Sequence, residues 1–246
     1  SSQGLVVSLL KTFARMVTGL ISCLKDRRLP YRYRWLHWLS YGSVWSPIQT
    51  TKLTAATFRQ DDRRCKNFIL QIHGAKFVRD AAEVSRAHNL KLFLVFGTLL
   101  GHYREGRLLG GDSDIDVGLL DEDYHQRDKF ITGMKARGYD VLHDSPYDLL
   151  MCKAGRPGFY IDVHRYYEKN NRIANTIDDP GLDYLCTFYY PLEVFWGLRE
   201  AHFLNRVKVL VPARPEEYLK ITYGNWQVPR DVQWRNYPNL VKEARN

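Results

Sequence analysis

Cysteine is scarce in this chain of 246 residues, and the four that occur lie far apart in the sequence. They form no Cys-x-x-Cys pair, so the sequence predicts neither a zinc site nor a disulfide framework. The chain also has no Gly-x-Ser-x-Gly elbow, no P-loop motif, no internal repeat and no low-complexity segment. The usual sequence signs of a serine hydrolase, a P-loop enzyme or a repeat protein are therefore missing.

A long uninterrupted hydrophobic run is missing as well. Residues 4–25 have apolar side chains at helical spacing, but Lys11 and Arg15 interrupt them, which argues against a transmembrane span. Basic and aromatic residues alternate over the next stretch, up to residue 38. Residues 4–38 could therefore lie at the surface of an anionic membrane, or they could pack on the protein itself or on a partner subunit.

The net excess of positive charge lies in the first quarter of the chain. Residues 1–66 contain 12 Lys and Arg against 3 Asp and Glu, whereas residues 67–246 contain 24 of each kind. A localised excess of positive charge favours one anionic partner, and we do not expect nucleic acid to bind. The alternative is a basic face that is only solvated by water. A connector rich in Ser, Thr, Gly and Pro then predicts two parts, an arm at residues 1–57 and a catalytic domain at residues 58–246.

The chemistry is concentrated in residues 97–118, which follow an apolar run typical of a strand. Asp112, Asp114 and Asp116 occupy alternate positions, so in a strand they point to one face. Three carboxylates on one face repel each other unless a cation lies among them or one keeps its proton. The pattern predicts a site for Mg²⁺ or Mn²⁺, ions that take oxygen ligands and leave positions for phosphate.

The beginning of the same stretch predicts contacts to an anion. Gly97 and Thr98 precede an expected helix start, whose free N–H groups can bind phosphate. Arg104 and Arg107 lie between this turn and the aspartates and could hold a phosphate oxygen. A phosphate cradle followed by paired carboxylates is typical of nucleotidyltransferase active sites; the alternative is a helix cap followed by solvated aspartates.

A further carboxylate stands in a later apolar strand, where Asp162 has apolar neighbours on both sides. A buried aspartate is costly unless it is paired or bound to a cation. We expect Asp162 to join Asp114 and Asp116 as a metal ligand or to act as general base, while Asp112 is a further ligand or the base. His164 lies two residues further on the same face and could contact phosphate, acceptor or only a neighbour.

Periodicity and capping residues predict the remaining elements. Together with the nucleotidyltransferase-type layout of residues 97–118, these elements give an expected α+β fold, with a nucleotidyltransferase-like mixed sheet flanked by helices and a basic helical arm at the N-terminus. The expected helices span residues 61–89, 121–137, 191–204 and 215–223, and the expected strands span residues 92–96, 112–117, 139–143, 148–153, 159–167 and 206–211.

The stretch resembles the signature of the LicD/fukutin family. The resemblance rests on Gly-Thr-Leu-Leu-Gly at 97–101, Arg104, and the Asp-x-Asp-x-Asp pattern, and on a later Tyr-Gly-x-Trp motif at 223–226 followed by Pro229. It covers roughly residues 92–229. Gly110 and Gly111 replace the Pro-Trp often found in the family, and Ser113 stands where a fourth acid is common.

The resemblance implies transfer of a phospho-alcohol, such as phosphocholine or an alditol phosphate, from a CDP-linked donor to a glycan or lipid-linked glycan. It also implies a peripheral membrane protein of the cytoplasm if the source is bacterial, or a Golgi protein if it is eukaryotic. Two other hypotheses remain open: a nucleotidyltransferase that attaches a nucleotide to a small molecule, protein or RNA, and a glycan-binding module without catalysis.

Overall fold

The computed structural model describes residues 62–245 except 111, 113, 154–159, 180, 205 and 231–233, with side chains from residue 70 onward. From Arg63 onward, the described residues belong to one compact unit of the chain. The predicted arm at residues 1–57, and with it the interpretation of residues 4–38, lies outside the described residues. In the described part, none of the helices combines the length and the apolarity that crossing a membrane requires.

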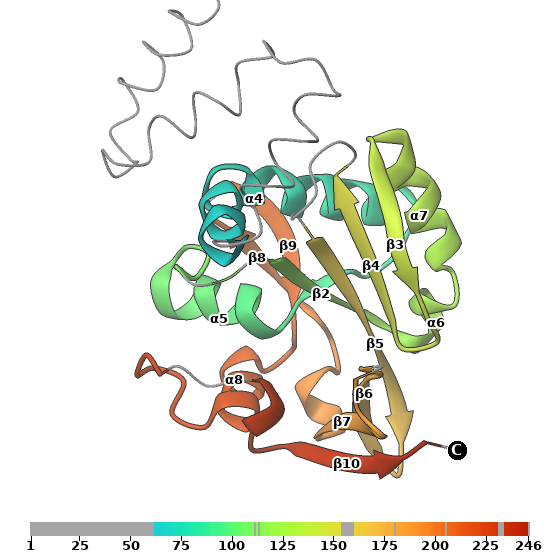
Figure 1. Ribbon diagram of the computed structural model, residues 1–246, viewed down its shortest axis with the longest axis vertical. Helices are drawn as coiled ribbons and strands as arrows, with labels where there is room; N and C mark the ends of the chain where they lie inside the picture. The colour runs from blue at the N-terminus through green and yellow to red at the C-terminus, as the bar shows by residue number, and fades with distance from the viewer. Residues whose placement is uncertain are drawn as a thin grey trace, which may run out of the picture. The chain divides into compact units, whose positions relative to one another are not determined.

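The fold is α+β, as predicted, and its described strands form one mixed sheet (Figure 1). Its main path runs β10-β7-β6-β5-β2-β1-β9-β8, and β4 adds to β5 and carries β3. The strands are β1 (Phe93–Leu94), β2 (Asp114–Leu120), β3 (Tyr139–Asp144), β4 (Asp148–Lys153), β5 (Tyr160–Lys169), β6 (Arg172–Ile177), β7 (Tyr184–Tyr190), β8 (Arg199–Phe203), β9 (Val207–Val211) and β10 (Leu240–Ala244). The helices are α4 (Asp62–Ala87), α5 (Phe96–Glu105), α6 (Asp121–Tyr124), α7 (Arg127–Ala136) and α8 (Pro215–Tyr223), with short 3-10 turns η2 (Leu192–Val194) and η3 (Trp234–Asn236).

Strand β5 is the centre of the sheet. It runs parallel to β2 along one edge, and along its other edge it pairs antiparallel first with β4 and then with β6. Alternate side chains of β2 and β5 therefore point to opposite faces of the sheet. One face carries Ile115, Val117 and Val163, all fully buried, and the other face carries the acidic residues.

The helices divide between these two faces. Helix α4 packs against the apolar face, where a Cβ at Gly74 would lie 3.6 Å from Ile115, and α7 packs on α4 through Gly133 and Val84. Helix α5 lies on the acidic face beside α8 (Figure 1). The acidic face is thus the one that α5 and α8 border.

Buried aromatic rings fix α5 and α8 to the sheet. The hydroxyl of Tyr218 on α8 lies 2.9 Å from that of Tyr166 on β5 and accepts a hydrogen bond of 3.3 Å from the amide of Phe96. Tyr218 also stacks on Tyr190, with ring centroids 4.8 Å apart. Since all these rings are buried, the start of α5 is held rigidly over β5.

Two sequence predictions about helices are wrong. Residues 191–204 form η2 and strand β8 instead of one helix, because Gly197 and Leu204 have left-handed backbone angles of φ 73° and 51° and β8 pairs with β9. The helix expected over residues 121–137 is divided into α6 and α7. Strands β6, β7, β8 and β10 were not predicted, although each is held by pairing within the sheet.

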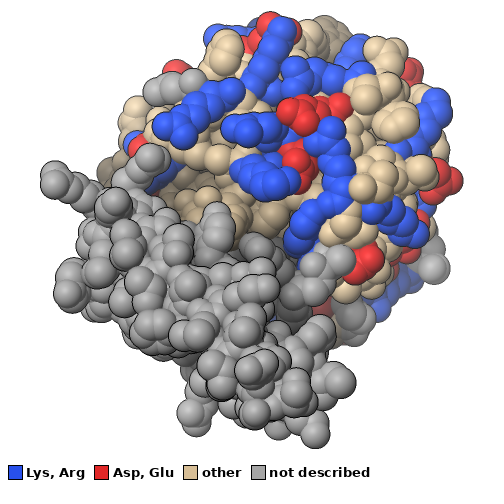
Figure 2. Space-filling model, turned by 90° about the horizontal axis from the view of Figure 1, so that it is seen from above, with Lys and Arg blue, Asp and Glu red and all other residues tan. Residues whose placement is uncertain are grey.

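Lysine and arginine side chains gather on the face seen from above in Figure 2. Two basic residues of this region are paired with acids of α4: Lys76 on α4 lies 2.6 Å from Asp80, and Arg137, just after α7, lies 2.7 Å from Glu83. Such pairs leave little net charge, in agreement with the neutral balance of residues 67–246.

Candidate active site

The register between β2 and β5 brings Asp116 and Asp162 side by side. Their Cα atoms are direct partners in the parallel ladder, and Gly118 is the partner of His164. Because residues two apart in a strand share a face, His164 points to the same side as both carboxylates. Its Nε2 atom lies 3.7 Å from Asp116 Oδ1 and 3.6 Å from Asp162 Oδ2, and one ligand atom of each residue lies within 4.8 Å of the others.

These three side chains are largely removed from solvent. The exposed fraction is 4% for His164, 14% for Asp116 and 24% for Asp162. Asp162 Oδ1 and both ring nitrogens of His164 make no hydrogen bond to any described residue. Buried polar atoms in folded proteins normally have partners, so donor atoms left free in this way fit a site that takes a cation.

The ionisation of the group reflects this crowding. Burial lowers the pKa of His164, but the carboxylates of Asp162 and Asp116 outweigh burial and raise it to about 9. Burial raises the pKa of Asp162 to about 6, with His164 opposing and Asp116 reinforcing the change. The site thus stabilises positive charge between its two carboxylates.

The start of α5 positions Asp116. The amide of Gly97 donates a 3.0 Å hydrogen bond to Asp116 Oδ2, and the amide of Asp116 donates one of 2.9 Å to the hydroxyl of the fully buried Thr98. Phe96, just before them, has a left-handed backbone with φ 39°, which is unusual for an aromatic residue. We expected Gly97 and Thr98 to contact phosphate; in the structure their polar groups hold the Asp116 strand, and phosphate binding by them remains a prediction.

Asp112 lies directly against Gly97. A Cβ atom at Gly97 would come within 2.6 Å of Asp112 Oδ2, so only glycine lets the carboxylate approach this closely. Burial raises the pKa of Asp112 to about 8, and the charges of Asp116 and Asp114 add to the effect while Arg104 opposes it. Asp112 therefore holds a proton more readily than an ordinary aspartate, beside the cation site.

Asp114 is the member of the predicted metal set that the structure places differently. It lies two residues before Asp116 on β2, opposite Tyr160 of β5, and it is not part of the three-residue group that approaches within 4.8 Å. His164 completes that group in its place. Asp114 and Asp116 lie on the same face of β2. Metal binding by Asp114 therefore stays a prediction.

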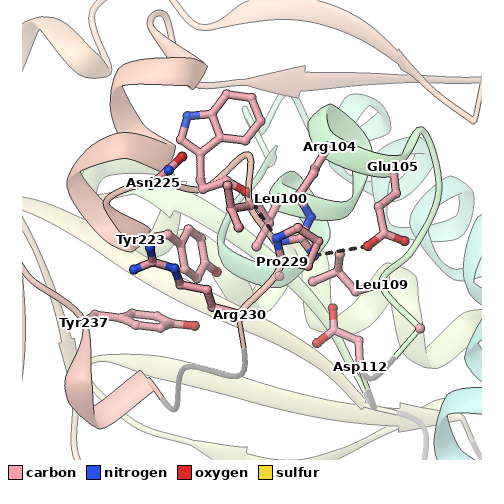
Figure 3. Close-up of a pocket in the computed structure, with 14 residues that line it drawn as sticks. Leu100, Arg104, Glu105, Leu109, Asp112, Tyr223, Asn225, Pro229, Arg230 and Tyr237 are labelled. Atoms are coloured by element: carbon pink, nitrogen blue, oxygen red, sulfur yellow. Dashed lines mark hydrogen bonds and ion pairs between the residues drawn. The ribbon is translucent and has the colours of Figure 1, made fainter.

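A pocket of about 500 Å³ opens beside Asp112 (Figure 3). The side chain of Arg104 is 15% exposed there, and it bonds Glu105 at 3.1 Å and the carbonyl oxygen of Trp226 at 3.5 Å. Arg107 is 61% exposed and pairs with the other side of Glu105 at 3.0 Å, so of the two predicted arginines only Arg104 lines the pocket. The lining residues are Gly97, Leu100, Arg104, Glu105, Leu109, Gly110, Asp112, Tyr223, Asn225, Trp226, Val228, Pro229, Arg230 and Tyr237.

The C-terminal segment forms the wall of this pocket opposite α5. Tyr223 and Tyr237 meet edge to face with ring centroids 4.7 Å apart, and Figure 3 shows Arg230 on the same side of the pocket as these two rings, with Asp112 across from them. The Tyr-Gly-x-Trp motif indicated part of this wall only through family resemblance. Nothing in the sequence signalled Arg230 or Tyr237, because their place in the pocket depends on how the tail folds back along the sheet.

One more acidic residue near the site was missed. Asp148 on β4 is the ladder partner of His164, so it shares the acidic face. Its carboxylate lies 3.4 Å from His143 Nε2. Residues 148–153 were predicted as a strand, but no local pattern indicated that the first residue of this strand would lie beside His164.

Comparison with known proteins gives this geometry a context. A human ribitol-5-phosphate transferase, FKTN, is 24% identical over 202 residues, covering 78% of this chain and 42% of the human protein. An uncharacterized protein of Rickettsia prowazekii is 28% identical over 151 residues, covering 61% of this chain and 54% of that protein. The chain spans about half the length of the curated relatives it matches.

Among solved structures, the crystal structure of ANT(2")-Ia in complex with adenylyl-2"-tobramycin is 16% identical, with a TM-score of 0.35 over 55% of this chain and 67% of that chain. The model of the family described as LicD/FKTN/FKRP, nucleotidyltransferase domain, matches residues 89–214, just over half of the sequence. This match includes β2, β5 and the start of α5, which together hold the carboxylates. The chain therefore belongs to the LicD/FKTN/FKRP family, and the resemblance found in its sequence is confirmed.

Proposed function

We propose that this protein transfers a phospho-alcohol, of the phosphocholine or alditol-phosphate type, from a CDP-linked donor to a hydroxyl group of a glycan or lipid-linked glycan. The observation that carries the proposal is the buried group Asp116, Asp162 and His164 beside a pocket lined by arginines and aromatic rings. Membership of a family that includes a ribitol-5-phosphate transferase supports the choice of substrates.

A divalent ion, Mg²⁺ or Mn²⁺, fits the donor atoms that these residues leave free. Asp116 and Asp162 would hold it, with Asp114 on the same strand face. When bound, such an ion supplies charge stabilisation to the phosphate oxygens during displacement. The hydrogen bond from Gly97 keeps Asp116 in place for this role.

The pocket supplies groups for a nucleoside diphosphate. The rings of Tyr223, Tyr237 and Trp226 offer apolar surface against which a base can stack. Arg104 and Arg230 lie in the same pocket and can pair with the diphosphate oxygens. Because Asp112 is also part of the lining, a donor bound here would end beside the carboxylates.

Asp112 is the residue we assign as general base. It lines the pocket and lies against Gly97, beside the proposed cation site. Its pKa of about 8 applies without a bound ion; the positive charge of a bound ion would lower that pKa and leave Asp112 ionised and able to accept the proton. In the step, the acceptor oxygen forms a bond to the phosphorus that carries the alcohol, and the bond from that phosphorus to the bridging oxygen breaks. CMP leaves with the bridging oxygen, and the acceptor proton passes to Asp112.

Product analysis tests this proposal against its alternatives. The full chain would be incubated with Mn²⁺, an oligosaccharide acceptor and CDP-choline, CDP-glycerol or CDP-ribitol. Release of CMP together with an acceptor heavier by the phospho-alcohol supports it. Release of pyrophosphate from a nucleoside triphosphate, with the nucleotide kept on the acceptor, would instead identify a nucleotidyltransferase. Acceptor binding without turnover of any donor would indicate a glycan-binding module.

We further propose that residues 4–38 bring the protein to an anionic membrane where the acceptor is presented. The support is the charge excess of residues 1–66 and the basic and aromatic sequence that ends near residue 38. Deleting residues 1–38 should weaken sedimentation with phosphatidylserine vesicles more than it weakens transfer to a soluble acceptor. Equal vesicle binding by the deleted and full chains would refute the membrane role.

A further inference from the structure

We infer that His164 is a nitrogen ligand of the metal centre, and that the centre therefore takes a divalent transition ion in preference to Mg²⁺. The assignment rests on the proposed function, since that function requires the ion. It goes beyond the carboxylate set that the sequence pattern predicts, because neither Asp114 nor Asp112 belongs to the closely approaching group.

The two separations between the imidazole and the carboxylates suit a shared ion. Two donors about 2.1 Å from one ion lie roughly 3 Å apart at a right angle and roughly 4.2 Å apart on opposite sides. Nε2 of His164 lies 3.7 Å from the nearest oxygen of Asp116 and 3.6 Å from that of Asp162. Both separations fall between these limits, although they exceed normal hydrogen-bond lengths.

The imidazole is held in this position and has no other described partner. Its ring is 4% exposed and meets the ring of Phe96 edge to face, with centroids 5.0 Å apart. Phe96 is itself fixed by its left-handed backbone and by the hydrogen bond to Tyr218. A histidine that served only to pack the core would be expected to satisfy its ring nitrogens, but both lack a hydrogen bond to the described residues.

The donor set decides which ion is favoured. Mg²⁺ prefers oxygen ligands in an octahedron and gives up water reluctantly. An imidazole nitrogen suits transition ions better, and histidine is their commonest ligand. Two carboxylates with one imidazole therefore favour a divalent transition ion over Mg²⁺, whereas the three carboxylates expected from the sequence would suit Mg²⁺ and Mn²⁺ alike.

If His164 instead serves only as a charge partner of the carboxylates, its removal should have the opposite effect on metal binding. A protonated imidazole that only neutralises Asp116 and Asp162 would compete with a metal ion, so removing it would tighten the binding of every divalent ion. A ligand histidine, in contrast, contributes a bond to the ion. Removing it would weaken Mn²⁺ binding and affect Mg²⁺ much less.

The experiment uses the full chain loaded with Mn²⁺. Electron spin echo spectroscopy should show coupling of the ion to ¹⁴N, and His164→Phe and His164→Gln should abolish that coupling. In titrations followed by the free Mn²⁺ signal, with Mg²⁺ as competitor, His164→Phe should lower the preference for Mn²⁺ by about tenfold or more. His125→Gln is the matched control, because His125 also lies 3.4 Å from an aspartate but is 63% exposed.

The possible failures can be told apart. Mn²⁺ binding without nitrogen coupling in the unmodified chain, or tighter binding of both ions by His164→Phe, would overturn the ligand role and leave the proposed function standing. If neither ion binds, the metal-dependent function and the ligand role are both wrong. The spectrum of the unmodified chain decides the matter even if a variant does not fold.

Discussion

Replacing Gly97 by alanine tests how the start of α5 controls the site. The new Cβ atom would lie 2.6 Å from Asp112 Oδ2, 3.0 Å from Oδ1 and 3.1 Å from Cγ. Ordinary contacts begin near 3.4 Å, so the carboxylate must move by roughly 0.8 Å. The same residue donates the hydrogen bond to Asp116 Oδ2, so both acids are affected by one methyl group.

The effects on stability and on activity should differ. Alanine is preferred to glycine inside a helix by about 1 kcal/mol, which offsets much of the cost of moving a short, partly accessible side chain. Thermal stability should therefore change little. Catalysis depends on the exact placement of reacting groups, and a displacement near 1 Å can cost about 100-fold in rate. We expect kcat/KM to fall between about tenfold and 100-fold.

Gly106 provides the control, at the end of the same helix. Its backbone is left-handed, with φ 63°, and a Cβ there would meet no atom within 4 Å. Gly106→Ala should lower stability by about 1 kcal/mol through backbone strain and leave donor turnover unchanged. Thermal melts and CMP-release kinetics on both variants measure the contrast. Full activity in Gly97→Ala, or equal loss of activity in both variants, would refute the positioning role.

Three further predictions concern the carboxylates, the pocket and the sheet. Asp116→Asn should abolish CMP release, because a carboxylate that would hold the ion is lost while the shape of the side chain is kept. Retained turnover would remove Asp116 from the metal site. Tyr237→Ala should raise KM for the CDP-linked donor by about tenfold with a smaller change in kcat, as expected for loss of a stacking surface; an unchanged KM would place the base elsewhere. Burial raises the pKa of Glu243, but hydrogen bonds from Lys169, Tyr189 and Thr187 outweigh it and lower the pKa overall. The stabilisation of the folded state by the Glu243 carboxylate is therefore present above the ordinary pKa near 4.5 and is lost as pH falls through the lowered value. Urea unfolding at a series of pH values should show this loss of stability in the unmodified chain and not in Glu243→Gln. The same dependence of stability on pH in both proteins would contradict the prediction.

The local pattern around Asp114 and Asp116 could be read from the sequence because it depends on one strand alone. Alternation places these two residues on one face whatever surrounds the strand, and the structure has them there on β2. The helix that begins near Gly97 was also predictable, since an apolar strand followed by Gly-Thr is a local signal. The mixed α+β class followed from the same kind of periodicity.

Longer-range features were beyond such reasoning. Strands β6, β7, β8 and β10 are defined by pairing with distant segments, and the apolar spacing of residues 191–204 imitates a helix that the positive φ of Gly197 forbids. Pairing partners can lie more than fifty residues apart, as Thr187 and Val241 do. Local propensity contains no information about such partners.

The sequence by itself determined that this chain has an acidic strand shortly after a Gly-Thr pair, and it predicted that a cation binds to that strand. Only the tertiary structure decided that Asp116 meets Asp162 and His164, because the register between β2 and β5 is set by the whole sheet. It likewise decided that Tyr223, Arg230 and Tyr237 close the neighbouring pocket. A shift of one residue in that register would turn the β5 side chains to the opposite face and separate the three donors.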